Sequence, residues 1–129
     1  MGLSQFDEQL AIVGVGIINA ATGTGRIAAA PFQGRQHRVD AVYCTNTDVI
    51  AHNVRLWLNR GGVFGLLGSE NVPAGAGTGG SPSIDLIATC LPASQTGLVL
   101  DNTCELDVSV EVAVTLTYEV DVIVQAGNV

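Results

Sequence analysis

Few residues of this chain have the types and spacing that catalysis needs. Residues 23–28, GTGRIA, match the G-x-G-x-x-A pattern of dinucleotide-binding loops, but no alternation of strands and helices surrounds them, so we predict no nucleotide site. A phosphate-binding P-loop requires a lysine, and the chain contains none. His37 and His52 lie on different predicted strands, and no G-x-S-x-G segment supplies a nucleophilic serine. We therefore predict a protein that is not an enzyme and needs no cofactor.

The three cysteines indicate neither a metal site nor a nucleophile, and three reduced thiols are favoured over a disulfide. Cys44, Cys90 and Cys104 form no C-x-x-C pair and no Cys/His spacing typical of zinc. Cys44 lies in an apolar predicted strand, where burial makes a thiol unreactive. Cys90 and Cys104 lie closer to loops and are the possible disulfide, within one chain or between two. Because the number of cysteines is odd, at least one must be free or pair with another chain. The alternative to a disulfide is that all three thiols are reduced.

The longest regular pattern, residues 104–124, predicts β-structure. Every second residue from Leu106 to Val124 is apolar, apart from the hydroxyl of Tyr118, whereas the alternate residues are mostly polar. A period of two is typical of a strand with one face on a core and the other in water. The segment is longer than a usual strand, so we expect a reversal near residues 115–118 that gives two antiparallel strands.

The polar register of this segment places several carboxylates on one predicted face. Such a face could collect calcium, but the segment lacks an Asp-x-Asp loop with its turn glycine, so we predict a solvated face and no metal site. The carboxylates are Glu105, Asp107, Glu111, Glu119 and Asp121.

Shorter alternating segments, separated by turn residues, fill the rest of the chain. Asn46-Thr47-Asp48 and Arg60-Gly61-Gly62 are turn sequences, and the five glycines of residues 68–83 are typical of a loop. Ser83 can cap a short helix over residues 84–91. The predicted strands are residues 10–18, 26–29, 37–45, 49–59, 63–67 and 97–100, of which 37–45, 49–59 and 63–67 form a meander.

Several short strands with frequent turns predict an all-β fold, an antiparallel two-sheet sandwich of the jelly-roll kind. We place the β-sandwich domain at residues 37–129. Residues 1–36 are assigned to an N-terminal strand and a long extended arm, because residues 19–36 are rich in glycine and alanine and show little regular pattern. Aromatic residues are only 5% of the chain, so the core must consist mainly of Val, Leu, Ile and Ala.

The charge distribution makes nucleic acid a poor partner. Residues 1–60 contain all five arginines and four acids, whereas residues 61–129 contain eight acids and no base, within a net charge of −7. The acidic and arginine-bearing parts could meet across a subunit contact, or the acids could serve solubility alone. The apolar run Leu10–Ile18 is too short to span a bilayer, so we predict no membrane contact.

Several segments after Val39 share a pattern of strands and turns with a known class of proteins. They include VDAVYCTNTD at 39–48, NVPAG at 71–75, SIDLI at 83–87 and VIVQAG at 122–127. From Val39 to its end the chain resembles small virion proteins of tailed bacteriophages. The resemblance implies a β-sandwich structural protein, such as a capsid decoration or cement protein or a minor head or tail component. We expect a homo-oligomer, such as a trimer, that binds other virion proteins after synthesis in the host cytoplasm.

The partner-binding residues are our own hypothesis, because the N-terminal third lies outside this resemblance. The arm 19–36 would lie on a neighbouring capsid or tail subunit, where Arg26, Arg35 and Arg38 would pair with carboxylates.

Trp57 lies in the polar register of its predicted strand, where it either covers a second face or anchors a contact. The alternative function is a carbohydrate- or receptor-binding module of a virion or tail, since jelly rolls also include lectins. Trp57 and Tyr43 would then be the stacking residues.

Overall fold

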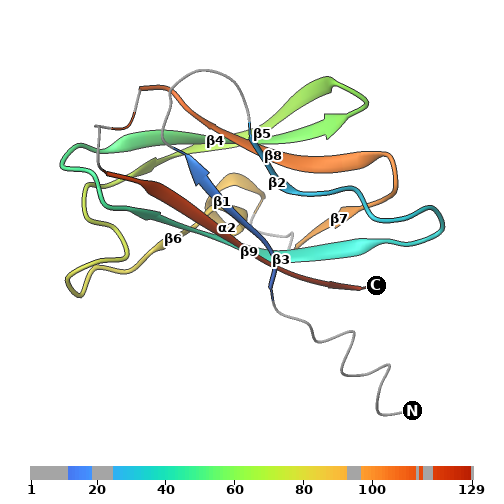
Figure 1. The fold of residues 1–129 in the computed structure, drawn as a ribbon, viewed down its shortest axis with the longest axis horizontal. Helices are drawn as coiled ribbons and strands as arrows, with labels where there is room; N and C mark the ends of the chain where they lie inside the picture. The colour runs from blue at the N-terminus through green and yellow to red at the C-terminus, as the bar shows by residue number, and fades with distance from the viewer. Residues whose placement is uncertain (1–11, 19–24, 93–96, 113, 115–117, 129) are drawn as a thin grey trace, which may run out of the picture.

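Two antiparallel β-sheets face each other across one apolar core (Figure 1). The computed structural model describes residues 12–18, 25–92, 97–112, 114 and 118–128. Sheet A has the strand order β1 (Ile12–Ile18), β9 (Val120–Asn128), β3 (His37–Asn46) and β6 (Ile84–Asp85), and β7 (Leu98–Leu100) also pairs with β3. Sheet B has the order β2 (Gly25–Ala28), β8 (Cys104–Val110), β4 (His52–Arg60) and β5 (Val63–Val72).

The strand orders of the two sheets are those of a jelly roll, in which the chain passes repeatedly from one sheet to the other. β1 and β3 lie in sheet A and are followed by β2 and β4 in sheet B, and β8 in sheet B is followed by β9 in sheet A. The strand pairs are antiparallel throughout the described residues. The predicted all-β, antiparallel two-sheet sandwich is confirmed.

The N-terminal strands belong to the sandwich, which differs from our division at residue 36. β1 pairs with β9, and β2 pairs with β8. The short strand predicted at residues 26–29 within the arm is therefore β2 of sheet B, and its residues Ile27 and Ala28 are buried in the core. Residues 19–24 of that arm lie outside the described residues.

The segment 104–124 forms two strands, but they do not form a hairpin. β8 pairs with β2 and β4 in sheet B, whereas β9 pairs with β1 and β3 in sheet A. The expected reversal at 115–118 falls largely on residues 115–117, which lie outside the described residues. The apolar register does face the core in both strands, because each sheet turns one face toward the other. Its buried members are Leu106, Val108, Val110, Val120, Val122 and Val124.

The predicted meander is correct only for its second half. β3 and β4 lie in different sheets, whereas β4 and β5 form a hairpin across Gly61 and Gly62. These glycines have φ values of 60° and 89°, which is the conformation that a two-residue hairpin turn requires. β4 begins at His52 rather than at residue 49, because residues 48–50 form a bend.

β5 continues to Val72, so it is longer than the predicted strand 63–67. The helix α2 (Leu86–Cys90) packs closely against it at Gly68, where a Cβ atom would lie 2.8 Å from the Cβ of Cys90. This glycine therefore marks a close approach between a strand and a helix rather than the start of a loop.

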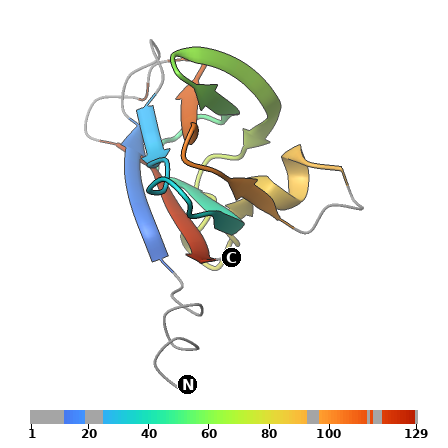
Figure 2. The same cartoon turned by 90° about the vertical axis from the view of Figure 1, so that its right-hand side faces the viewer.

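The helix closes the side of the sandwich opposite β1 and β2, as Figure 2 shows. Its N-cap is Asp85 rather than the predicted Ser83. One carboxylate oxygen of Asp85 accepts hydrogen bonds from the backbone N–H of Ile87 (3.0 Å) and of Val42 in β3 (3.1 Å). The cap therefore also attaches the helix to sheet A, while Leu86 and Ile87 are buried in the core.

Candidate functional site

The outer face of sheet B brings aromatic and polar side chains together from its four strands. We call it the Trp57 face. Its central row consists of directly opposed residues from the four strands, Arg26, Asp107, Trp57 and Leu66. These residues alternate along their strands with core residues, so they point away from sheet A. The rows on either side are Glu105, Asn59 and Phe64, and Ser109, Arg55 and Ser69.

Trp57 is fixed by contacts on two sides. Its indole N–H donates a hydrogen bond to the Ser109 hydroxyl at 2.8 Å. Its ring meets the Phe64 ring edge to face, with the centroids 6.2 Å apart and the planes at 88°. Phe64 and Leu66 remain 43% and 52% exposed beside it. The result is an aromatic surface held by two side-chain contacts, with an exposed apolar margin on β5.

Asp107 is the unusual charge of this face, because it points outward yet is only 4% exposed. Burial, first, and the neighbouring carboxyl of Glu105, second, raise its pKa from the ordinary value of 3.8 to about 6. Asn59 and the Arg26 guanidinium act in the opposite direction by favouring the ionised carboxylate. Within the described residues, the Oδ1 atom of Asp107 has no hydrogen-bond partner. This carboxyl can therefore change its charge in mildly acidic solution.

An exposed ion pair borders the face. Arg55 and Glu111 contact each other across β4 and the end of β8. Hydrogen bonding from the Asn53 side chain and the charge of Arg55 lower the pKa of Glu111. Both side chains are about two-fifths exposed, so the pair adds little stability but presents both charges to solvent.

The Trp57 face combines apolar and polar groups in one surface. The described residues contain no group of three or more His, Cys, Asp or Glu side chains that could hold a metal ion. An aromatic ring flanked by amide, carboxylate and guanidinium groups can contact a ligand that has both apolar and polar surfaces.

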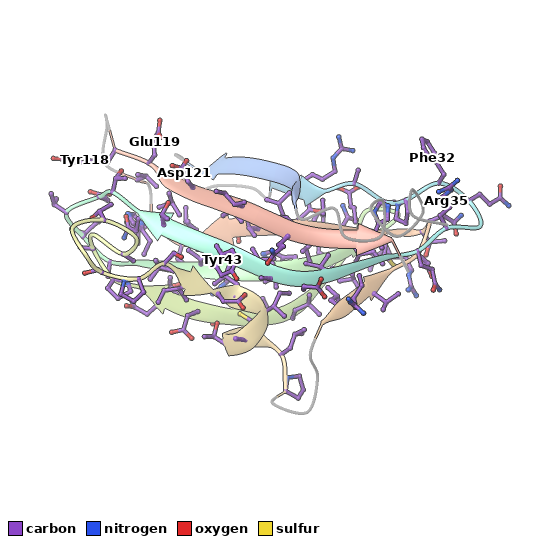
Figure 3. The ribbon with its side chains drawn as sticks, turned by 90° about the horizontal axis from the view of Figure 1, so that it is seen from below. Phe32, Arg35, Tyr43, Tyr118, Glu119 and Asp121 are labelled. Carbon is purple, nitrogen blue, oxygen red and sulfur yellow. The ribbon has the colours of Figure 1, made fainter. Side chains whose placement is uncertain are left out.

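Tyr43 lies on the opposite face of the molecule from Trp57. It alternates with the buried residues Val42 and Cys44 of β3, so it points outward from sheet A (Figure 3). Trp57 and Tyr43, the two predicted stacking residues, therefore cannot contact the same sugar, because the core separates the two rings.

The three predicted partner-binding arginines do not form one surface. Arg26 lies on β2 in the Trp57 face, whereas Arg38 lies on β3 and its Nε donates to Asp40 at 2.7 Å. Arg35 lies in the turn between β2 and β3, at the end of the sandwich remote from Glu119 (Figure 3). Arg38 already has a carboxylate partner within its own chain, so it is the weakest candidate for a contact with a neighbour.

A buried polar cluster that the sequence analysis missed lies where β3 leads into β4. The Nε2 atom of His52 is 2.8 Å from a carboxylate oxygen of Asp48, and both side chains are fully buried. The Asn46 amide donates to the carbonyl groups of Ile50, Val72 and Pro73, and its oxygen accepts the Asp48 N–H. The cluster joins the β3–β4 bend to the end of β5. The spacing Asn-x-Asp-x-x-x-His was the available signal, since Asn and Asp commonly bond nearby backbone.

The possible Cys90–Cys104 disulfide is absent, and all three cysteines are free. Cys90 packs against Gly68, which is opposite Leu56 on β4, whereas Cys104 is opposite Arg60, four residues farther along that strand. The two positions on β4, Leu56 and Arg60, are roughly 13 Å apart along the strand. A disulfide needs its two Cα atoms within about 7 Å of each other, so Cys90 and Cys104 lie too far apart.

The Cys104 sulfur instead accepts from Nε and a terminal nitrogen of Arg60, at 3.1 and 3.0 Å. Cys44 is buried as predicted, and burial raises the pKa of its thiol to about 12.

No helix within the described part of the chain is long and apolar enough to cross a membrane. Comparison of the chain with protein-family models, with curated protein sequences and with solved structures gives no match.

Proposed function

We propose that this chain is a non-enzymatic structural protein of a bacteriophage virion, a capsid decoration or cement protein that binds and stabilises the particle lattice. The observation behind the proposal is that large apolar side chains are exposed on both outer faces of the sandwich. Sheet B exposes Phe64 and Leu66, and sheet A exposes Tyr43, Val99 and Ile123. Exposed apolar patches on small proteins mark contacts with other proteins. A subunit held between neighbours in a lattice uses surfaces on opposite sides.

The outer face of sheet A also has ends of different charge. Tyr43 and Ile123 lie opposite each other in its middle. Glu119 and Asp121 lie toward one end, while Arg35 and Phe32 lie at the other (Figure 3). Opposite charges at the two ends favour a head-to-tail arrangement of neighbouring copies or contact with a lattice of alternating charge. In this proposal the partners are capsid or tail subunits, and the protein reaches them after synthesis in the host cytoplasm.

The first test asks whether the chain is present in particles. Virions made by the genome that encodes the chain are purified on a density gradient, and the chain is quantified relative to the major capsid subunit by mass spectrometry. A copy number that is a fixed multiple of the lattice repeat supports a decoration protein. Absence of the chain from purified virions contradicts the proposal.

The second test asks whether the sheet A face makes the contact. Particles assembled without the chain are mixed with the full chain and sedimented. Ile123→Lys places a charge in the middle of the apolar face and should reduce the bound fraction, because a lysine must be desolvated in the contact. Asn102→Lys adds the same charge in the turn before β8, away from both outer faces, and should bind like the wild type. Equal binding by both variants would remove this face from the contact.

A second candidate function is glycan binding at the Trp57 face. The observation that favours it is the indole held by Ser109, with Asp107 directly opposite it and Asn59 and Arg55 in the adjacent rows. Aromatic rings stack on the apolar faces of sugars, while amides and carboxylates bind hydroxyl groups. A glycan array should then give a signal that Trp57→Ala abolishes and Tyr43→Ala, on the opposite sheet, leaves unchanged. An array without signals would dismiss this candidate.

A further inference from the structure

The free edge of β5 is an unpaired strand with an apolar surface. Among the described residues, β5 is paired only on its β4 side. Val63, Phe64 and Leu66 are 74%, 43% and 52% exposed. A long exposed apolar edge is a template for pairing with another strand, and natural proteins usually block it with charges or proline. Residues 61–69 contain neither.

The hairpin geometry fixes which backbone groups point to this edge. Arg60 and Val63 flank the two-residue turn and form the hydrogen-bonded pair that closes it. Hydrogen-bonded and non-hydrogen-bonded pairs alternate along an antiparallel ladder, so Gly65 also bonds to β4. The N–H and C=O groups of Phe64 and Leu66 therefore point away from β4, toward the free edge.

We propose that this edge pairs with the same edge of a second copy of the chain, antiparallel, about a two-fold axis at Gly65. Phe64 of each copy then lies opposite Leu66 of the other. In each such pair, the N–H of either residue donates to the C=O of the opposite residue. Gly65 of one copy lies opposite Gly65 of the other copy across the axis, and these two residues form a non-hydrogen-bonded pair. Sheet B becomes one continuous eight-stranded sheet, and the central rows of the two Trp57 faces join through Leu66 and Phe64.

A second copy can pair at this edge because the edge is uncharged and is complementary to itself about a two-fold axis. Each copy has a net charge of −7, so two copies repel over most of their surfaces. The β5 edge around Gly65 is uncharged, and the two-fold axis matches each apolar side chain with another apolar one. By contrast, the β2 edge of the same sheet is short and presents Arg26. The helix α2 contacts β5 at Gly68. The proposed pairing uses the backbone groups of Phe64 and Leu66, so this contact lies beyond them.

This inference does not rest on the proposed function, since the pairing requires only the chain itself. It replaces the expected trimer with a two-fold dimer. Absence of the chain from virions would leave the dimer standing, and a monomeric chain would leave the proposed lattice contact on sheet A standing.

The test is sedimentation velocity of the full chain from micromolar to millimolar concentration, with two lysine variants. The wild type should approach twice the monomer mass. Leu66→Lys should weaken the dimer by about tenfold or more, because an edge lysine blocks strand pairing. Val99→Lys introduces the same change at a similarly exposed valine of sheet A and should dimerise like the wild type. A monomer at all concentrations, a trimer, or a dimer that resists Leu66→Lys would overturn the proposal.

The position of the axis is tested by cross-linking in a Cys90→Ser background. Gly65→Cys should give a disulfide-linked dimer on mild oxidation, because Cα atoms of a non-hydrogen-bonded pair lie about 4.5 Å apart, within disulfide range. A Cβ atom fits at Gly65, where the nearest atom is 3.9 Å away. Ser69→Cys, exposed on the same strand, would not face itself and should remain monomeric on a non-reducing gel. Equal cross-linking of the two variants would refute this register.

Discussion

Replacing Asp107 by asparagine should make the protein more stable at neutral pH and change how its stability depends on pH. The carboxyl is 4% exposed, and its pKa is raised from 3.8 to about 6 by burial and by Glu105. Asparagine has nearly the same shape and has no charge to bury. Its amide can still accept from Asn59 and can donate to Glu105, so the local hydrogen bonds have replacements.

The direction and size follow from the proton linkage. Between pH 4 and pH 6 the unfolded chain has lost the Asp107 proton while the folded protein retains it, so the free energy of unfolding of the wild type falls as pH rises. The shift from 3.8 to about 6 corresponds to at most about 3 kcal/mol, at about 1.4 kcal/mol for each pH unit. Below pH 4 this destabilisation is absent, and above pH 6 it is complete. The free energy of unfolding of Asp107→Asn, relative to that of the wild type, should therefore increase by up to about 3 kcal/mol from pH 4 to pH 7.

The assay is urea unfolding of both proteins at several pH values, and the result is the difference between their free energies of unfolding. Carboxylates that are distant from Asp107 titrate alike in both proteins and cancel in this difference. Asp101→Asn is the matched control, because hydrogen bonds from Thr103 lower the pKa of Asp101, so that variant should lose stability relative to the wild type as pH rises. A difference for Asp107→Asn that stays constant from pH 4 to pH 7 would refute the reasoning.

Three further results are expected. His52→Ala should lower the free energy of unfolding by about 3 kcal/mol or more in urea, because it removes the buried partner of Asp48 and leaves a cavity; a loss below about 1 kcal/mol would contradict this. Leu56→Ala, at a fully buried position of β4, should cost about 3 kcal/mol in the same assay, and a neutral result would place Leu56 outside the core. A thiol reagent at pH 8 should label the half-buried Cys90 and leave Cys44 unlabelled in peptide mass spectra, since burial raises the Cys44 pKa to about 12; equal labelling would exclude that environment.

Much of the fold could be predicted from local patterns. Alternation placed Leu106, Val108 and Val110 on the core side of β8, and the glycine pair 61–62 correctly predicted the hairpin between β4 and β5. These features depend on neighbours along the chain, because side chains alternate across any strand and a two-residue turn requires positive φ values.

The candidate site could be predicted only in part. Trp57 was recognised as unusual, but its contacts with Ser109 and Phe64 join three strands that are far apart or separated by a turn in the sequence. Asp107 was expected in water with the other carboxylates. Its burial depends on β2 and β4 lying on either side of β8, an arrangement that alternation within β8 does not contain.

The sequence by itself therefore determined that this chain forms antiparallel strands, which side chains of those strands face a core, and where a tight turn must occur. Only the tertiary structure decided which strand lies in which sheet, and with it that Trp57 and Tyr43 lie on opposite faces and that Cys90 and Cys104 lie apart. The physical reason is that backbone hydrogen bonds are the same for any pair of strands. The choice of partner comes from packing between residues distant in sequence, which in this protein places β3 and β4, and likewise β8 and β9, in different sheets.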